Sequence, residues 1–269
     1  MGGACVTRRT AVAAASVVIT LILGGCGASE ARTASASHPD AAAQTIASTL
    51  AGIPQHGQLL GNGASPVKAT LYGDLECPYC REFALGHAFS ELIAHQVRAG
   101  ALAIVYRSVC TATCAGGTEQ VLRTPQLGAN QNGSVFAAPP IATSVTGQPP
   151  QLTFVTQQVA AYAAGRQGRF WEFVMLFLRA QRASGSGYVT EAFLDQLARE
   201  TPGLNYERWK ADRRSALLAR QVAADQTAAA LHGVVSTPTL VFYGPRGTRT
   251  LSTTNASYRT LTAALRSVR

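Results

Sequence analysis

Apolar residues follow two different spacings along the first half of the chain. Val67 to Gly73 and Ala101 to Val109 are short runs rich in branched and aromatic residues, which predicts buried strands. Between them, apolar residues recur every three or four positions, which predicts an amphipathic helix that ends at Gly100. These residues are Leu85, Phe89, Leu92, Ile93 and Val97. Strand, helix and strand with short connections favour a right-handed parallel βαβ unit.

The second half of the chain is helical before strands return. Helical spacing occurs in four segments, which are Leu152 to Ala164, Phe170 to Arg182, Thr190 to Arg199 and Tyr206 to Leu231. A strand, a turn, a second strand and a closing helix are then predicted at Ser236 to Tyr243, Gly244 to Gly247, Thr248 to Ser252 and Ala256 to Val268. Ahead of the βαβ unit we expect a short helix at Ala41 to Ala51 and a small edge strand at Gln58 to Gly61.

Between Cys110 and Pro150 the periodicity disappears into Gly, Thr, Pro, Gln and Asn. A loop of this length without secondary structure is unusual in a compact domain, so it is expected to be functional, disordered or pinned. Cys110 and Cys114 stand at its start and are able to pin it.

The N-terminal segment has the pattern of an export signal. Two arginines precede an apolar run of 13 residues, Ala11 to Leu23, which is too short to cross a membrane comfortably. The run ends in Leu-Gly-Gly-Cys, which resembles the lipobox of bacterial lipoproteins and would leave Cys26 as a lipid-bearing N-terminus. The alternative is an ordinary signal with a chance cysteine. Residues 27–40 are rich in Ala, Ser and Thr and predict a flexible tether.

The chain carries a formal charge of +9 and 47% hydrophobic residues, enough for a sizeable core. Its arginines are scattered without a run of five or six, which favours a solvated basic surface over nucleic-acid binding. Attraction to an anionic membrane or cell wall is compatible with this charge but not required by it.

The stretch with the clearest chemistry is Cys77-Pro78-Tyr79-Cys80, directly after the first predicted strand. Pro78 suits the first position of a helix, because the N–H that proline lacks has no partner there. Cys77 then occupies the N-cap, with its sulfur facing free backbone N–H groups and the positive end of the helix dipole. This position favours the thiolate, the species that attacks disulfides. The spacing therefore predicts thiol–disulfide exchange.

Two other uses of these cysteines remain open. Cys77 and Cys80 with Cys110 and Cys114 form a four-cysteine set that has zinc-ligand spacing, although exported proteins seldom rely on such sites. A purely structural Cys77–Cys80 bridge would close too small a ring to constrain the unfolded chain much.

Two motifs resemble those of DsbA-like thiol oxidoreductases, which have a thioredoxin fold with a helical insertion. One is Tyr-Gly-Asp-Leu-Glu-Cys-Pro-Tyr-Cys-Arg-Glu-Phe from Tyr72, and the other is Gly-Val-Val-Ser-Thr-Pro-Thr-Leu-Val-Phe from Gly233. The resemblance runs from about Gly57 to Arg269, weakly between Cys110 and Pro150. It implies an α/β fold with a signal peptide at 1–25, a tether and short helix at 26–53, a thioredoxin domain at 54–109 and 204–269, and an insertion at 110–203 that is irregular to 150 and then helical.

The resemblance also assigns roles to residues. Cys77 would be the exposed nucleophile and Cys80 the buried resolving thiol. Pro238 would be cis, with Thr237 offering its backbone to the substrate chain; the alternative is an ordinary trans proline at a strand start.

Family members often keep a buried acid six residues before the first cysteine, where this chain has Leu71. Asp74 and Glu76 are the nearby candidate proton acceptors for Cys80. Each is as readily explained as a solvated or capping acid.

The remaining cysteines are expected to pair locally. If Cys5 is removed with the signal and Cys26 is lipidated, four cysteines allow three pairings, and the fold supports 77–80 and 110–114. Cys110 and Cys114 would then form a structural disulfide, with a second redox pair as the alternative. The Pro-Tyr dipeptide is glutaredoxin-like, which predicts a redox potential between those of glutaredoxin and DsbA and a Cys77 pKa between about 3.5 and 7.

The expected function is a membrane-anchored oxidoreductase on the outer face of the bacterial cytoplasmic membrane that passes its disulfide to reduced or unfolded secreted proteins. By resemblance, a quinone-linked membrane enzyme would reoxidise it, with no cofactor besides the cysteines, no metal and no nucleic acid. One alternative is a reductase or isomerase kept reduced by a membrane electron donor. Another is a lipoprotein of the same fold that binds an envelope partner without turnover.

Overall fold

The computed structural model describes residues 41–114 and 150–269, and the parts of the chain outside these ranges include the predicted signal, Cys26, the tether and most of the irregular loop. The described residues contain a six-stranded sheet in the order β1-β2-β4-β3-β5-β6. Its strands are β1 (Gln55–His56), β2 (Leu59–Leu60), β3 (Val67–Gly73), β4 (Leu102–Ser108), β5 (Thr239–Gly244) and β6 (Gly247–Ser252).

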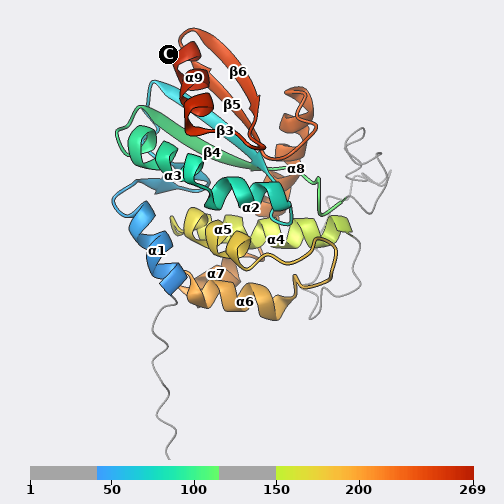
Figure 1. Ribbon diagram of the computed structural model, residues 1–269. Coiled ribbons are helices and arrows are strands. Elements are labelled where there is room, and N and C mark those ends of the chain that lie inside the picture. Colours follow the sequence, from blue (N-terminus) through green and yellow to red (C-terminus); the bar gives the residue numbers. More distant parts are fainter. Residues whose placement is uncertain (1–40, 115–149) are drawn as a thin grey trace, which may run out of the picture. The chain divides into compact units, whose positions relative to one another are not determined.

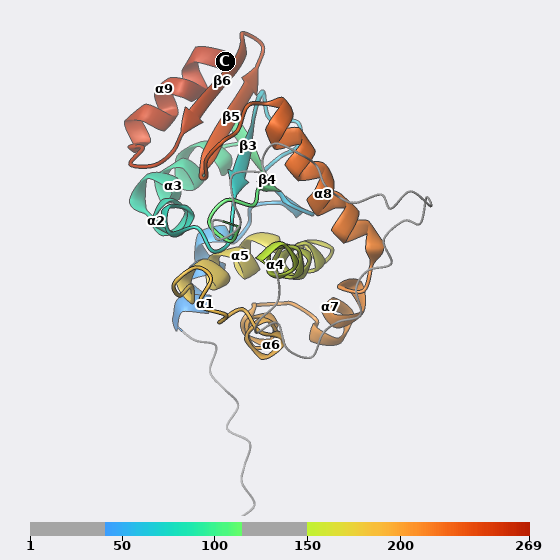
Figure 2. The ribbon, with the colours of Figure 1, turned by 90° about the vertical axis from the view of Figure 1, so that its right-hand side faces the viewer.

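Helices cover both faces of this sheet (Figures 1 and 2). One face carries α2 (Pro78–Leu85), α3 (His87–Leu92), the π-helical turn η1 (Ile93–Val97) and α9 (Tyr258–Val268), and the other carries α8 (Ala216–Leu231). A further group packs beside them: α1 (Ala41–Leu50), α4 (Pro150–Gly165), α5 (Phe170–Arg179), α6 (Glu191–Glu200) and α7 (Tyr206–Asp212). Within the described ranges, no helix is long and apolar enough to span a bilayer.

The βαβ pairing predicted from periodicity is present. β3 pairs in parallel with β4 over its whole length, and it pairs antiparallel with β5, which places β3 at the centre of the sheet. Apolar side chains of β3 and β4, among them Val67, Leu71 and Ile104, are buried in the same hydrophobic cluster as aromatic residues of α5 such as Trp171. The core therefore extends continuously from the sheet into the helical group.

The predicted helix from Pro78 to Gly100 is interrupted. Gly86 has φ −82° and ψ 161°, which is extended backbone, so α2 ends before it and α3 begins after it. A side chain at Gly86 would place its Cβ 2.5 Å from the carbonyl oxygen of Glu82, which explains why a glycine occupies the break. The spacing of apolar residues continues across Gly86, so it did not predict the break in the helix.

The single helix predicted from Tyr206 to Leu231 is also wrong in one place, because the chain leaves the helix at 213–215. Arg213 turns inward there and binds the carboxylate of Glu191 through two hydrogen bonds of 2.7 and 2.9 Å. The break lets α7 pack against α4 and α6, while α8 turns toward β4. The expected edge strand at 58–61 exists as β2, but β1 pairs outside it and takes the edge.

Candidate active site

The Cys-Pro-Tyr-Cys segment begins α2, at the end of the central strand. Cys77 has φ −75° and ψ 119°, as an N-cap residue should, and Pro78 occupies the first turn. Cys77 is thus the N-cap as predicted, and although its side chain makes no hydrogen bond that caps the helix, the backbone N–H of Cys80 is among the groups that lower the pKa of Cys77. The Cys77 thiol donates to the carbonyl oxygen of Thr237, at 3.4 Å.

Burial is the second difference from expectation. The resemblance implies an exposed Cys77 above a buried Cys80, yet the two residues are only 4% and 6% exposed. The Thr237 backbone lies over the sulfur of Cys77. Gln181, just after α5, donates from Nε2 to the backbone carbonyl oxygens of Leu75 and Cys77, at 2.8 and 3.1 Å. Both contacts come from segments far along the chain, so the local motif does not contain them.

The two thiols differ in acidity rather than in exposure. Hydrogen bonding by Cys80 is the main cause that lowers the pKa of Cys77 to about 6, and the Thr237 side chain adds to it against the opposing effect of burial. Burial, followed by the Cys77 sulfur beside it, raises the pKa of Cys80 well above its ordinary value. At neutral pH the negative charge of the pair therefore lies on Cys77, the first cysteine of the motif.

The loop before β5 brings Pro238 to this helix end. The Thr237–Pro238 peptide bond is cis. β5 starts at Thr239, which pairs with Tyr72 on β3, so the preceding residues lie beside the turn that follows β3. This register places the Thr237 carbonyl against Cys77, across 160 residues of sequence.

Both candidate acids are buried at this site. Asp74 is 1% exposed and its carboxylate accepts five hydrogen bonds, one from the Glu76 N–H and the others from the backbone and hydroxyl groups of Thr111 and Thr113. Glu76 is 2% exposed and accepts from the N–H of Gly185, at 3.2 Å. Burial raises the pKa of both carboxyls. Neither is a solvated surface acid.

A cavity of about 20 Å³ lies beneath Cys80, large enough for a single water molecule. Leu71, at the position of the family's buried acid, lines it together with Tyr106 and Pro238. Asp74 is the one carboxylate residue in its wall, and the Asp74 N–H lies 3.5 Å from the sulfur of Cys80. Asp74 is therefore the acidic residue that shares this cavity with Leu71, the residue that stands where family members often have a buried acid.

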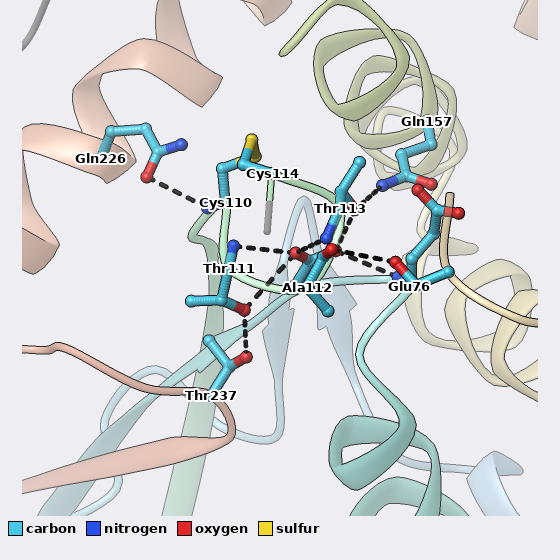
Figure 3. The surroundings of a disulfide bond; sticks show 11 residues. Glu76, Cys110, Thr111, Ala112, Thr113, Cys114, Gln157, Gln226 and Thr237 are labelled. Carbon is cyan, nitrogen blue, oxygen red and sulfur yellow. Dashed lines mark hydrogen bonds between the residues drawn. A yellow bond between two sulfur atoms is a disulfide. The ribbon is translucent and has the colours of Figure 1, made fainter. Parts of the chain in front are cut away.

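Cys110 and Cys114 are joined by a disulfide with a Cα–Cα distance of 5.6 Å, which is one of the two local pairings expected (Figure 3), while Cys77 and Cys80 are both free thiols. Both residues of the disulfide are 3% exposed. Two of the four cysteines that a zinc site would need are therefore bonded to each other. Across residues 41–114 and 150–269, no three His, Cys, Asp or Glu residues lie together as potential metal ligands.

Three contributors to the site were missed from sequence: Thr111, Thr113 and Gln181. The two threonines lie between the paired cysteines and reach Asp74 from the end of β4. One signal for them existed, because β3 and β4 were predicted as parallel neighbours, and the residues after such strands meet at one edge of a sheet. Nothing in the sequence pointed to Gln181.

Comparisons with known proteins agree with this architecture. Residues 55–130 match a family model described as Thioredoxin, and no curated protein matches the chain. Oxidised BdbD from Bacillus subtilis superposes with a TM-score of 0.55 and 17% identity, over 80% of this chain and 96% of BdbD. The alpha-DsbA1 protein of Wolbachia pipientis gives a TM-score of 0.52 at 10% identity, over 78% and 89% of the two chains.

A thioredoxin-like oxidoreductase from Silicibacter pomeroyi DSS-3 gives a TM-score of 0.50 at 18% identity, over 77% of this chain and 89% of its own. At these identities the likeness establishes the fold. The expected α/β thioredoxin fold with inserted helices is confirmed, and it is the DsbA-like form of that fold.

Proposed function

We propose that the protein is a thiol–disulfide oxidoreductase that forms or exchanges disulfides in secreted proteins through Cys77 and Cys80. The observation that carries this proposal is the unequal acidity of the two thiols, with the pKa of Cys77 lowered to about 6 and that of Cys80 raised. A low-pKa first cysteine is both a good nucleophile and a good leaving group, whereas a buried partner with a high pKa is needed only to resolve the intermediate.

In the oxidising direction, a substrate thiolate attacks the Cys77 sulfur of the Cys77–Cys80 disulfide. The Cys77–Cys80 bond breaks, a mixed disulfide forms, and Cys80 leaves with the electron pair and takes up a proton. A second substrate thiolate then attacks the substrate sulfur and releases Cys77 as a thiolate. The substrate loses two electrons and the enzyme gains them, so an oxidant must accept them before the next cycle, and the proposed oxidant is a quinone-linked membrane enzyme.

The surface near Cys77 suits an unfolded chain. Tyr79 and Val235 are 52% and 75% exposed, which is unusual for large apolar side chains. Val235 stands two residues before Thr237, and the Thr237 carbonyl oxygen lies 3.4 Å from the sulfur of Cys77. A substrate chain bonded to Cys77 would therefore lie beside the Thr237 backbone. An apolar surface binds apolar side chains of a substrate, and a folded substrate keeps such side chains buried. The exposed surface beside Cys77 therefore favours substrates that are reduced and incompletely folded.

The Cys77 pKa of about 6 also favours one alternative, a reductase or isomerase that a membrane donor keeps reduced. It lies closer to the value of about 7 in thioredoxin than to the value of about 3.5 in DsbA. Measuring the redox potential of the Cys77–Cys80 pair against glutathione distinguishes an enzyme that oxidises its substrates from one that reduces them. An oxidase should refold a reduced substrate faster than it reduces insulin, and a reductase should show the reverse.

Trapping tests the proposal itself. The Cys80→Ala variant should accumulate mixed disulfides through Cys77, because the thiol that resolves them is gone. The trapped chains would identify substrates and the membrane partner. A Cys80→Ala protein that accumulates no mixed disulfide, in cells or with a reduced model protein and oxidised glutathione, would overturn the proposal.

For location, we propose a lipid anchor at Cys26 on the outer face of the bacterial cytoplasmic membrane. The support is the apolar run before Leu-Gly-Gly-Cys and the tether-like composition after it. The Cys26→Ser variant should move from the membrane fraction to the soluble fraction and lose labelling by radioactive palmitate. Unchanged labelling would contradict the anchor.

A further inference from the structure

Two exposed arginines stand beside the groups that hold the carbonyl oxygen of Cys77. This oxygen accepts from the backbone N–H of Arg81, at 3.2 Å, and from the side chain of Gln181, at 3.1 Å. Arg182 directly follows Gln181 in the chain, and both arginines are exposed. Two segments that are far apart in sequence therefore each bring a positive charge to the turn that carries Cys77.

The packing of α2 against α5 adds a third exposed arginine. The two helices lie side by side (Figure 1), and Arg179 stands in the last turn of α5, two residues before Gln181. Among the described residues, no carboxylate lies within ion-pair distance of Arg81, Arg179 or Arg182. Their charges are therefore not neutralised by the part of the chain that the structure describes.

Acidic residues in the same region do not offset this charge. Asp74 and Glu76 are 1% and 2% exposed, and their carboxylates accept hydrogen bonds from backbone N–H groups of the fold. Glu82 is the one exposed acid within residues 75–85 and 178–188. The exposed surface of these two segments therefore carries three arginines against one glutamate.

A positive surface beside a reactive sulfur attracts negatively charged partners and speeds their encounter with it. The attraction reaches about 10 Å at 0.1 M salt, so it acts on the part of a substrate that lies close to the bond being exchanged. Cys80 and Thr237 supply the main effects that lower the pKa of Cys77. We therefore expect Arg81 and Arg182 to act on the approach of the substrate rather than on the acidity of the Cys77 thiol.

We propose that the preferred substrates carry acidic residues beside their reactive cysteine, and that Arg81 and Arg182 select them. The preference names a substrate class and rests on the proposed exchange reaction. In that reaction the substrate thiolate attacks the Cys77 sulfur, the Cys77–Cys80 bond breaks, and Cys80 leaves with the electron pair and takes up a proton. The arginines bind the substrate's carboxylates and take part in no bond that forms or breaks.

An anionic membrane surface would also attract arginines. The substrate is favoured because these arginines flank the turn at which a substrate must bond to the chain, whereas the other arginines are scattered along the sequence. A charge needed only for membrane attachment would have no reason to be placed at the backbone of Cys77.

The test compares two reduced peptides that differ only in having glutamate or glutamine on both sides of a single cysteine. Each peptide reduces the oxidised full-length protein, and the rate is measured by mass spectrometry after acid quenching. Each rate is divided by that of the same peptide with 2-hydroxyethyl disulfide, an uncharged disulfide, which corrects for the effect of the glutamates on the peptide's own thiol. At about 0.01 M salt the glutamate peptide should react about threefold to tenfold faster, the size expected for two exposed ion pairs. The advantage should nearly disappear at about 1 M salt, where charges are screened beyond ~3 Å.

Substitutions assign the preference to its residues. The double variant Arg81→Gln, Arg182→Gln should bring the corrected ratio to within about twofold of one, and lysine at both positions should keep most of the preference. Arg246→Gln is the matched control, because Arg246 is exposed beyond the end of β5 that lies away from Thr239, and it should leave the ratio as in the parent. The pKa of Cys77 is measured in each variant, and a change in the double variant would show that the arginines act on the thiol instead.

A corrected ratio near one for the parent at low salt would overturn the proposal, and so would a double variant with the same ratio as the parent. Vesicles of phosphatidylglycerol and phosphatidylcholine test the membrane reading. Loss of vesicle binding in the double variant, with equal rates for the two peptides in the parent, would assign the arginines to the membrane surface. Failure of both peptides to reduce the parent is a separate result, because it contradicts the proposed exchange reaction and the substrate preference with it.

Discussion

Two cysteine pairs follow two adjacent parallel strands of this sheet, and their chemistry differs. Both pairs are buried, and both begin within a few residues of the paired strand ends Gly73 and Ser108. After β3 the chain enters a helix at Pro78, and the first sulfur becomes acidic. After β4 it makes a non-helical turn, and the sulfurs bond to each other.

The difference shows that strand position and burial do not make a cysteine reactive. Reactivity comes from the backbone that follows the strand and from the partners that the rest of the fold supplies. Cys77 has Cys80 and Thr237 beside it, both of which lower its pKa. Cys110 has only Gln226 on its N–H, at 3.2 Å, and a sulfur partner four residues away.

The largest difference between the pairs should appear in activity. Cys77→Ser should lower disulfide exchange by roughly a thousandfold or more, because it removes the attacking atom. The double variant Cys110→Ala, Cys114→Ala should keep activity within about tenfold of the parent, since its sulfurs are bonded to each other in the fold. The measurement is the rate of oxidative refolding of a reduced model protein. Full biological activity of Cys77→Ser would favour a binding role without turnover.

The second difference is a pH dependence of the reduced protein. The pKa of Cys77 is near 9.0 when the chain is unfolded and about 6 in the fold, so the folded reduced state binds fewer protons between these values. The thiolate's contribution is therefore fully present above pH 9 and lost as the pH falls through 6. Between those limits the free energy of unfolding of the reduced form should rise relative to the oxidised form, by roughly 2–4 kcal/mol.

Urea unfolding of both redox forms from pH 5.5 to 9 measures this rise. Asp74 and Glu76 are present in both forms and Asp74 interacts with both thiols, so a variant that keeps both acids is needed to separate the contribution of Cys77. Reduced Cys77→Ser serves as the control and should lack the rise. Parallel curves for reduced and oxidised protein would show that the folded thiol is no more acidic than the unfolded one.

The third difference concerns stability. Loss of the Cys110–Cys114 bond should lower the free energy of unfolding by roughly 2 kcal/mol, because the bond closes a loop of only five residues. Oxidised parent and the alanine double variant, compared by urea unfolding at one pH, give this value. A change in unfolding cooperativity, rather than in midpoint, would mean instead that the loop unfolds separately from the domain.

The smallest effect is expected at the apolar surface beside Cys77. Val235→Ser should raise KM for an unfolded substrate by about twofold to fivefold and leave kcat nearly unchanged, because it removes apolar contact area and no reacting group. Leu217→Ser is the matched control, since Leu217 is exposed on the same helix as Leu231 but lies about 20 Å away along α8. Equal effects of the two substitutions would remove the case for substrate contact at Val235.

The sequence predicted the order of strands and helices because each segment has its own spacing of apolar residues. The breaks at Gly86 and at 213–215 were not predicted, since the apolar spacing continues through both. At 213–215 the break accompanies a tertiary contact, that of Arg213 with Glu191. The cysteine motif located the helix end that carries Cys77, but the hydrogen bonds that Cys77 makes to Thr237 and Gln181 join it to residues 160 and 104 positions away.

The contacts made by residues 110–114 were the hardest part of the site to predict from sequence. These residues looked like the start of a structureless loop, yet Thr111 contacts Asp74, 37 residues earlier, and Thr237, 126 residues later. Threonines between two cysteines carry no pattern that distinguishes such a link from a plain turn. Only the parallel register of β3 and β4 brings the two segments together.

Gln181 has a consequence for attempts to shorten the protein. Its amide holds the carbonyl oxygens of Leu75 and Cys77, and it is supplied by the segment between α5 and α6. A truncated domain that keeps only the sheet and the helices that cover it would lack this amide. The carbonyl oxygens of Leu75 and Cys77, in the turn before α2, would then lose their hydrogen-bond donor. The segment between the inserted helices therefore supports the turn that carries Cys77, and a minimal domain would need a substitute amide to keep that turn in place.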